Sequence, residues 1–455
     1  MSLYTAVCSH ALFPLHERLK GHDSVAVRQR LEASQWWPRE AIEADRVARL
    51  RRFLVDAGTR VPYYRDLYAQ SGFDPHALQS VADLARLPLL GKPEIRAHAE
   101  RIKATGHGAL QRYNTGGSSG EPLIFFIGKD RVTHDVAAKW RATRWWGVDI
   151  GDPEMVVWGS PIELGAQDRV RRIRDKLLRT QLLPAFEMSH AKVDGFFAAI
   201  RQQRPRMLFG YPSALTHIAR HAEKRGIAMD DLGIKVAFVT SERLYDDQRA
   251  TIGRIFGCGV ANGYGGRDAG FIAHECPSGG MHLTAEDIIV ETVGADGQPV
   301  PAGQPGEIVT THLATRDFPF IRYRTGDVAV LGTEACACGR GLPLINELQG
   351  RTTDFVVAAD GTVMHGLALI YILRDLPGVQ SFKIVQETLQ HTVVQLVVDE
   401  RFARSQSAEI VAAFQRRLGA AVKVELQFVD RIAAENSGKF RYVVSRVAGQ
   451  RSQAD

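Results

Sequence analysis

Between about residue 110 and residue 350, short apolar segments alternate with segments that carry apolar residues at helical spacing. Strands that alternate with helices are typical of a layered α/β domain with a largely parallel sheet. The expected strands are 123–127, 155–158, 206–210, 236–240, 288–293 and 307–311, and the expected helices include 193–203 and 213–225. The sequence therefore predicts a large layered α/β domain as the main body of the chain.

The segments on either side of this body differ from it. Residues 1–110 read as a largely helical leader, with apolar residues at helical spacing between 44 and 57. The last hundred residues combine expected strands (381–385, 392–398, 421–428) with expected helices (367–376, 407–418). Because 455 residues exceed what one core usually holds, we expect two domains. The N-terminal domain would cover 1–353 and a small C-terminal α+β domain 354–455.

Composition limits the partners and the compartment. Hydrophobic residues make up 45% of the chain and charged residues 24%, which is typical of a globular protein. No apolar run approaches the roughly 20 residues of a membrane span, and the N-terminus makes a poor signal peptide, so we expect a cytoplasmic protein. The net charge of +6 comes without a nucleic-acid-binding motif. The densest basic patch, 169–179, is interpreted as a solvated helix face, with a polyanion contact as the alternative.

A dense run of small residues follows the helical leader. It comprises Thr115, Gly116, Gly117, Ser118, Ser119 and Gly120. Such a run lets the backbone curl and present several N–H and hydroxyl donors to a phosphate chain. No Lys-Ser/Thr pair follows the last glycine, so the run is not a Walker A loop. We predict an oligophosphate-binding site here, with an ordinary flexible turn as the alternative.

Three further segments follow in a fixed order: Tyr-Gly-Gly-Arg-Asp at 264–268, Tyr-Arg-Thr-Gly-Asp at 323–327 and Ser-Gly-Lys-Phe-Arg at 437–441. Together with the glycine-rich run, they resemble the adenylate-forming enzymes, which include acyl- and aryl-CoA ligases, luciferases and peptide-synthetase adenylation domains. The closest resemblance is to the phenylacetate–CoA ligase and capsular-polysaccharide-synthesis branch. It implies an ATP- and Mg²⁺-dependent ligase whose C-terminal domain is a mobile lid.

The resemblance assigns roles to the segment at 264–268. Tyr264 and Gly265 would lie near the adenine and the substrate, and the carboxylate of Asp268 would ligate Mg²⁺, which prefers hard oxygen donors. The chain departs from the family twice, because Arg267 replaces a hydroxyl residue and Asp268 replaces Glu. Arg267 would contact a phosphate or pair with Asp268.

The later segments supply the remaining groups that the resemblance implies. Asp327 would accept both ribose hydroxyls, and Arg351 would reach the ribose or the α-phosphate. Asp354 would be the hinge of the lid. Lys439 would be delivered to the α-phosphate and the carboxylate for adenylation and then withdrawn. An exposed lysine that only adds charge is the alternative for Lys439.

The acid itself has to lie near the strand ends. Trp140, Tyr211 and Ser213 are the candidate walls of its pocket, and Ser241 and Glu242 fall where the family contacts adenine. Aromatic walls would suit an aryl acid, but each of these aromatics is as easily explained as plain core. The sequence does not identify the acid.

Four residues form a candidate metal site. Cys276, His282, Cys336 and Cys338 would offer three thiolates and one imidazole, the shell of a tetrahedral Zn²⁺ site, with His274 as the alternative imidazole. A filled shell would make the site structural, which argues against a zinc hydrolase. Three reduced thiols without a metal are the alternative.

These observations predict a two-step ligase. The acid would attack the α-phosphate of ATP, pyrophosphate would leave, and the acyl-adenylate would pass its acyl group to CoA as a thioester. Transfer to an amine, a sugar or a carrier protein is the first alternative, and a non-catalytic nucleotide-binding relative is the second. The oligomeric state stays open, with a homodimer among the options.

Overall fold

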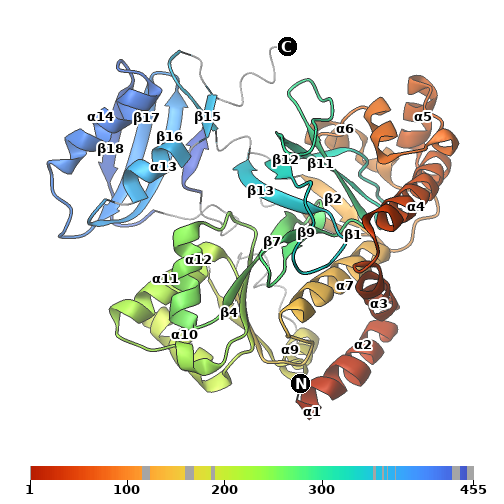
Figure 1. Cartoon of the computed structure of the whole chain (residues 1–455), viewed down its shortest axis with the longest axis horizontal. Coiled ribbons are helices and arrows are strands. Elements are labelled where there is room, and N and C mark those ends of the chain that lie inside the picture. Colours follow the sequence, from red (N-terminus) through yellow and green to blue (C-terminus); the bar gives the residue numbers. More distant parts are fainter. Residues whose placement is uncertain are drawn as a thin grey trace. The chain divides into compact units, whose positions relative to one another are not determined.

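The structure is a computed structural model that describes residues 2–114, 123–158, 169–185, 190–351, 355–360, 363–365, 367–374, 376–432 and 441–447. The chain divides into two compact units (Figure 1). The larger unit holds most of the residues up to Leu348. The smaller unit holds the chain from Gln349 onward together with the earlier short segment Gly326–Val328. Each unit is described by itself below.

Helices dominate the first hundred residues of the larger unit. They are α1 (Leu3–Val7), a π-helical turn (Cys8–Leu12), α2 (Phe13–Leu19), α3 (Ser24–Ser34), α4 (Arg39–Arg60), α5 (Pro62–Ser71) and α6 (Lys92–Ile102). Pro62 begins α5 because proline fits the first helical turn. Gly72, with φ of 61°, ends it in the left-handed conformation that glycine adopts without strain. Leu50, Phe53 and Leu54 bury one face of α4.

An 11-stranded sheet is the centre of the larger unit. Its strands are β3 (Glu154–Trp158), β4 (Thr180–Pro184), β5 (Met207–Gly210), β6 (Val236–Thr240), β7 (Gly259–Gly266), β8 (Gly270–Glu275), β9 (Met281–Leu283), β10 (Ile288–Val293), β11 (Pro305–His312), β12 (Tyr323–Leu331) and β13 (Leu344–Arg351). Their order is β10-β11-β12-β13-β9-β8-β7-β6-β5-β3-β4. The strands from β4 to β7 pair in parallel, whereas β7–β8, β8–β9, β9–β13 and β10–β11 pair antiparallel. The sheet is thus more mixed than the expected largely parallel one, because a short turn such as β7–β8 can only join antiparallel strands.

Helices cover both faces of the parallel half. They are α7 (Lys129–Trp145), α9 (Arg169–Leu177), α10 (His190–Gln203), α11 (Pro212–Lys224) and α12 (Asp246–Phe256). Met155 and Val157 pack with α10, α11 and α12 in one core cluster. Met207 and Phe209 pack with α7 in another. Because successive side chains of a strand point to opposite faces, both faces of these strands are apolar.

A separate two-stranded hairpin, β1 (Gln111–Asn114) with β2 (Ile124–Ile127), belongs to the same unit. Its Phe125 and Ile127 are buried in the core cluster that also contains Tyr264 and Tyr323. The hairpin is therefore fixed against the β7 and β12 part of the sheet.

The smaller unit is an α+β domain. Its elements are β14 (Phe355–Val357), β15 (Val363–His365), α13 (Leu367–Arg374), β16 (Val379–Thr388), β17 (His391–Val398), α14 (Gln406–Leu418), β18 (Lys423–Phe428) and β19 (Val443–Ser445). Four strands form a sheet in the order β18-β17-β16-β19. Ile384, Leu396 and Phe414 are fully buried, so this unit has a core of its own. Among the described helices of both units, none combines the length and the apolar character that a membrane crossing requires.

Candidate active site at the carboxyl ends of the parallel strands

The carboxyl ends of β3, β5, β6 and β7 lie along one edge of the sheet, because these four strands are parallel neighbours. Open α/β sheets bind their ligands outside this edge. Trp158 ends β3 and Tyr211 directly follows β5. Ser241 directly follows β6, and Tyr264 lies near the end of β7. The topology of the sheet thus brings the predicted residues Tyr211, Ser241 and Tyr264 to one edge. Trp158, which was not predicted, lies at the same edge.

Tyr211, Ser213 and Glu242 are joined at this edge. The backbone N–H of Ser213 donates a 3.1 Å hydrogen bond to Oε2 of Glu242. Burial, and then the charge of Glu242, raise the pKa of Tyr211. The indole of Trp158 stacks on the Tyr211 ring at 4.3 Å between centroids and 24° between planes. Sequence reasoning missed Trp158 as a site residue, although its place as an aromatic at the end of a parallel strand was a usable signal.

The backbone of Ser241 is strained. Its φ is 72°, in the left-handed region that residues with a side chain rarely adopt. Such strain persists where the surroundings impose it, and it is concentrated at functional sites. The turn after β6 therefore carries a second sign of a site beside the sequence motif.

The turn between β7 and β8 needs glycine at two places. A Cβ on Gly265 would lie 2.0 Å from the carbonyl oxygen of Gly270. A Cβ on Gly270, whose φ is 91°, would lie 2.8 Å from the ring of His312. The strand register also shifts between Tyr264 and Gly265, and such a bulge re-aims the side chains that follow. The turn brings Asp268 to the sheet edge in this way.

Two side chains hold the Arg267–Asp268 segment. The hydroxyl of Tyr323, on β12, donates a 2.6 Å hydrogen bond to Oδ2 of Asp268. Nη2 of Arg131, on α7, donates a 3.1 Å hydrogen bond to the carbonyl oxygen of Arg267. Arg131 is itself buried and paired through Nε with Asp135. Burial lowers the pKa of Arg267. Arg131 lies outside every motif, so the sequence offered no signal for it.

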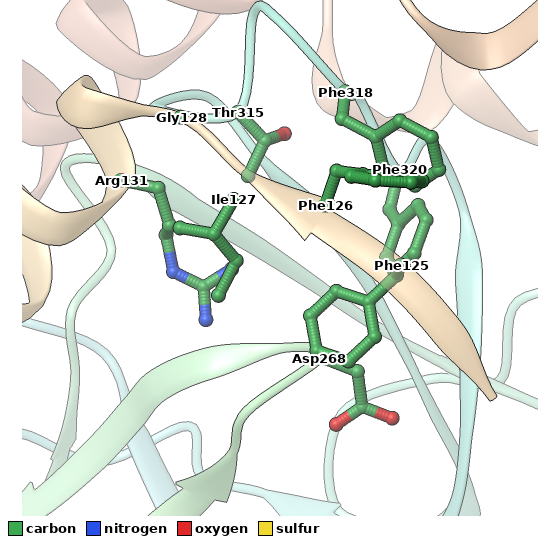
Figure 2. Close-up of a pocket in the computed structure, with 9 residues that line it drawn as sticks. All are labelled: Phe125, Phe126, Ile127, Gly128, Arg131, Asp268, Thr315, Phe318 and Phe320. Atoms are coloured by element: carbon green, nitrogen blue, oxygen red, sulfur yellow. The ribbon is translucent and has the colours of Figure 1, made fainter. Parts of the chain in front are cut away.

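A small pocket adjoins Asp268 (Figure 2). Its wall is aromatic, with Phe126 and Phe318 in edge-to-face contact at 5.4 Å. The complete lining is Phe125, Phe126, Ile127, Gly128, Arg131, Asp268, Thr315, Phe318 and Phe320. An apolar wall reduces the local dielectric and strengthens the interaction of Asp268 with a cation.

The predicted metal ligands come together in the larger unit. One ligand atom from each of Cys276, His282, Cys336 and Cys338 lies within 4.8 Å of the others. The Sγ atoms of Cys276 and Cys336 are 3.7 Å apart, and Sγ of Cys338 lies 3.2 Å from Nε2 of His282. Two thiolates bound to one tetrahedral Zn²⁺ are about 3.8 Å apart, as follows from Zn–S bonds of about 2.3 Å. The donor set and its spacing therefore fit zinc.

The structure distinguishes the two candidate histidines. His282 lies in the cluster, and burial lowers its pKa to about 4, which keeps the imidazole in the neutral form that binds metals. His274 instead stacks on Phe271, with ring centroids 5.5 Å apart. It also contacts Phe238 at 5.9 Å. His282 is thus the imidazole that accompanies the three cysteines.

A second group of possible metal ligands is His134, Asp135 and His312. The N–H of Ala314 donates to Nδ1 of His312, so the proton of this neutral ring is on Nε2 and neither nitrogen is free for a metal. His134 lies between carboxylates, 3.8 Å from Asp135 and 3.4 Å from Asp287. We assign this group as a buried ion-pair network.

Trp140 takes a different place from the other predicted pocket residues. Its indole N–H donates a 2.6 Å hydrogen bond to Asp149. Its ring meets Phe13 edge-on at 5.1 Å, and the guanidinium of Arg28 lies 4.4 Å from its centroid. These contacts with α2 and α3 give Trp140 a packing role.

Several predicted residues are not part of this geometry. The run from Thr115 to Gly120, Asp354 and Lys439 lie outside the described residues. Arg351 is the last residue of β13. Asp327 lies in β12, within the short segment that groups with the smaller unit.

Comparisons with known proteins agree with these features. Residues 356–446 match the family model of the CapK C-terminal domain. The chain is 26% identical over 388 residues to the phenylacetate-coenzyme A ligase of Thermus thermophilus, over 82% of this chain and 85% of that protein. It is 22% identical to Protein CapK of Staphylococcus aureus, over 81% of each. Its fold matches the crystal structure of 2-hydroxyisobutyryl-CoA ligase in the postadenylation state, with a TM-score of 0.73 at 20% identity, over 92% of this chain and 93% of that one.

The fold match confirms the predicted α/β architecture with its small α+β domain. The sequence matches extend over most of the chain and include both named lines of relatives that the motifs resemble. The family model accounts for the C-terminal unit separately. The comparisons therefore confirm the predicted resemblance to the phenylacetate–CoA ligase and CapK branch of the adenylate-forming enzymes.

Proposed function

We propose that the protein activates a carboxylic acid with ATP and passes the acyl group to CoA. The observation that carries the proposal is the sheet edge where Tyr211, Ser213 and Glu242 meet, near which Asp268 is held by Tyr323. Relatives that match over most of their length are named as acid–CoA ligases. A non-catalytic relative with the same fold would not need a carboxylate held in place at this edge.

The reaction has two steps. A carboxylate oxygen of the acid attacks the α-phosphorus of ATP, and the bond to the bridging oxygen breaks, so pyrophosphate leaves and an acyl-adenylate remains. The thiol of CoA then attacks the acyl carbon, loses its proton and displaces AMP. Asp268 would hold Mg²⁺, which when bound neutralises charge on the phosphates. Tyr323 and Arg131 orient the segment that carries Asp268.

The other roles follow from the motifs. The run from Thr115 to Gly120 would cradle the phosphates, and Asp327 would bind the ribose. Arg351 would contact the ribose or the α-phosphate. The smaller unit would act as a lid about Asp354 and bring Lys439 to the reacting phosphate. Arg267 would add positive charge near the phosphates.

The acid is proposed to be aromatic. The stacked rings of Trp158 and Tyr211 support this, because flat aromatic walls favour a flat aromatic ligand. Transfer to an amine, a sugar or a carrier protein in place of CoA is the competing proposal for the second step. The similarity to CapK is the reason to test this alternative acceptor.

We further infer one structural Zn²⁺ per chain, held by Cys276, His282, Cys336 and Cys338. Cys276 directly follows β8, His282 lies in β9, and Cys336 and Cys338 lie between β12 and β13. A metal there would cross-link this part of the sheet. With four protein ligands it would leave no position for a reacting water.

Pyrophosphate release tests the proposed function. Purified full-length protein would be assayed with ATP and Mg²⁺ across aryl, fatty and amino acids, with and without CoA. Release that requires an aryl acid and rises with CoA supports the proposal. Acid-dependent release that is indifferent to CoA favours another acceptor. No release with any acid of a broad panel contradicts a carboxylate-activating enzyme.

A further inference from the structure

The outer face of the N-terminal helices is unusually apolar. The helical segment from α1 through the π-helical turn to α2 buries Thr5, Cys8 and Phe13 on one side. Its opposite side exposes Leu3 at 83% and Leu19 at 81%. The other large apolar side chains exposed on this segment are Tyr4, Val7, Leu12 and Leu15. Soluble monomers rarely leave so many large apolar side chains together in water, and such a surface usually marks a contact site.

Helix α9 extends this apolar face. The hydroxyl of Tyr4 donates a 2.8 Å hydrogen bond to the carbonyl oxygen of Leu177, so α1 runs beside the end of α9 (Figure 1). Ile173 and Leu177, four residues apart on one side of α9, are exposed at 62% and 50%. The segment from α1 to α2 and helix α9 together expose eight large apolar side chains, and we call this surface the N-terminal face.

Basic residues lie beside the N-terminal face. The guanidinium of Arg179 lies 5.4 Å from the ring of Tyr4, and Arg18 and Lys20 are exposed at the end of α2. The sequence of α9 is also strongly basic, with Asp175 as its acidic residue. Among the described side chains of α9, Arg174 and Lys176 are basic.

We propose that the N-terminal face docks the protein on the surface of an anionic phospholipid bilayer. Leucine and isoleucine side chains enter the boundary between head groups and acyl chains, while the long lysine and arginine side chains keep their charges at the head groups. Clusters of basic residues on an amphipathic helix bind anionic lipid in this way. The helices lie along the bilayer surface and do not cross it.

Two other occupants satisfy less of this surface. A second copy of the chain would meet the same patch across a two-fold axis, which would place arginine against arginine. A nucleic acid would use the cations but leave the leucines in water. An anionic bilayer matches both the apolar side chains and the charge. This inference does not depend on the proposed ligase activity.

The test is co-sedimentation of the full-length protein with lipid vesicles. One set contains phosphatidylglycerol with phosphatidylcholine, and the other contains phosphatidylcholine alone. We expect binding to the anionic set, at least tenfold weaker binding to the neutral set, and weakening with added salt. A Leu15→Ser/Leu19→Ser variant should lose at least tenfold in partitioning. The matched control is Leu389→Ser, an exposed leucine of the smaller unit that should bind like wild type.

Both variants alter exposed side chains, so their thermal unfolding should match wild type. Equal binding of wild type to neutral and anionic vesicles, or no binding to either, would overturn the proposal. Sedimentation velocity tests the alternative that the N-terminal face binds a second copy of the chain. A stable dimer that dissociates in the Leu15→Ser/Leu19→Ser variant would show that the N-terminal face binds another copy and would equally overturn the proposal.

Discussion

The hydroxyl of Tyr323 donates a 2.6 Å hydrogen bond to Oδ2 of Asp268 and so ties β12 to the turn between β7 and β8. Tyr323 is fully buried, with its ring packed on Phe320 at 4.9 Å. A rigid donor of this kind holds a carboxylate in one orientation. Tyr323 belongs to the Tyr-Arg-Thr-Gly-Asp motif, so the structure gives the first residue of this motif a positioning role.

Removing that hydroxyl should weaken metal–nucleotide binding more than folding. In Tyr323→Phe, Asp268 loses a hydrogen bond to a charged acceptor, which is worth about 1.5 kcal/mol. We expect the KM for Mg-ATP to rise about tenfold in a pyrophosphate-release assay. Tyr4→Phe, which removes a hydroxyl that bonds to Leu177 at the end of α9, is the control and should leave KM unchanged. An unchanged KM for Tyr323→Phe would contradict the positioning role.

Arg131 should act on the same turn from the other side. Its guanidinium bonds to the carbonyl oxygen of Arg267 and to Asp135 at once, a geometry that the single ammonium of lysine does not reproduce. Arg131→Lys should therefore lower kcat/KM roughly tenfold, since about one charged hydrogen bond is lost. The control is Arg316→Lys, which alters an exposed ion pair with Asp130. Equal kinetics for the two variants would contradict this role of Arg131.

Lys439 should be needed for adenylation but not for nucleotide binding. In Lys439→Ala, the cation that meets charge developing on the transferring phosphate is missing, so pyrophosphate release should fall by orders of magnitude. ATP affinity, measured by calorimetry, should remain. Lys423→Ala removes an exposed lysine of the same unit and should stay active. Retention of activity in Lys439→Ala would contradict the proposed role of Lys439 in adenylation.

The zinc proposal predicts a metal content and a stability effect. Elemental analysis of the wild-type protein should find about one Zn per chain. Cys336→Ser should lose the metal and lower Tm, because metal binding adds to folding stability. Cys258→Ala changes a cysteine outside the cluster and should keep its zinc. A stably folded wild-type chain without zinc would contradict the site.

The buried pair of His134 and Asp287 should make stability depend on pH. Burial alone would lower the pKa of His134, but hydrogen bonds and attraction from Asp135 and Asp287 outweigh it and raise the pKa above 6.5. The protonated ring is thus favoured by folding. Its contribution is complete below pH 6.5 and declines as the pH rises through the folded-state pKa.

Urea unfolding in slightly acidic and in mildly alkaline buffer measures this contribution. The His134→Gln variant keeps a donor for Asp287 but does not titrate. The excess stability of wild type over this variant should therefore be largest in acid and shrink in alkali. An excess that grows with pH would show that the ring is neutral in the folded protein.

The sequence by itself determined the fold class and supplied the candidate site residues whose chemistry is recognisable from short motifs. Alternating strands and helices predicted the α/β body because periodicity follows directly from residue order. The expected strand 236–240 agrees with β6, and 288–293 agrees with β10. The sequence grouped Cys276, His282, Cys336 and Cys338 as candidate metal ligands because three thiols and one imidazole can complete a zinc shell. The strands and helices depend on neighbours in the chain, whereas the four candidate ligands follow from residue type.

The tertiary structure decided which distant residues meet. Arg131 and Trp158 belong to no motif, and they reach the site only because α7 and β3 pack beside β7 and β5. Trp140 looked like a pocket wall in the sequence, yet the packing of α2 and α3 around it made it a core residue. The choice of His282 over His274 depended on the β8–β9 register, since the two residues pair across these strands while only His282 lies among the cysteines. Contacts of this kind are set by close packing between elements that are distant in the chain, which local sequence patterns do not reveal.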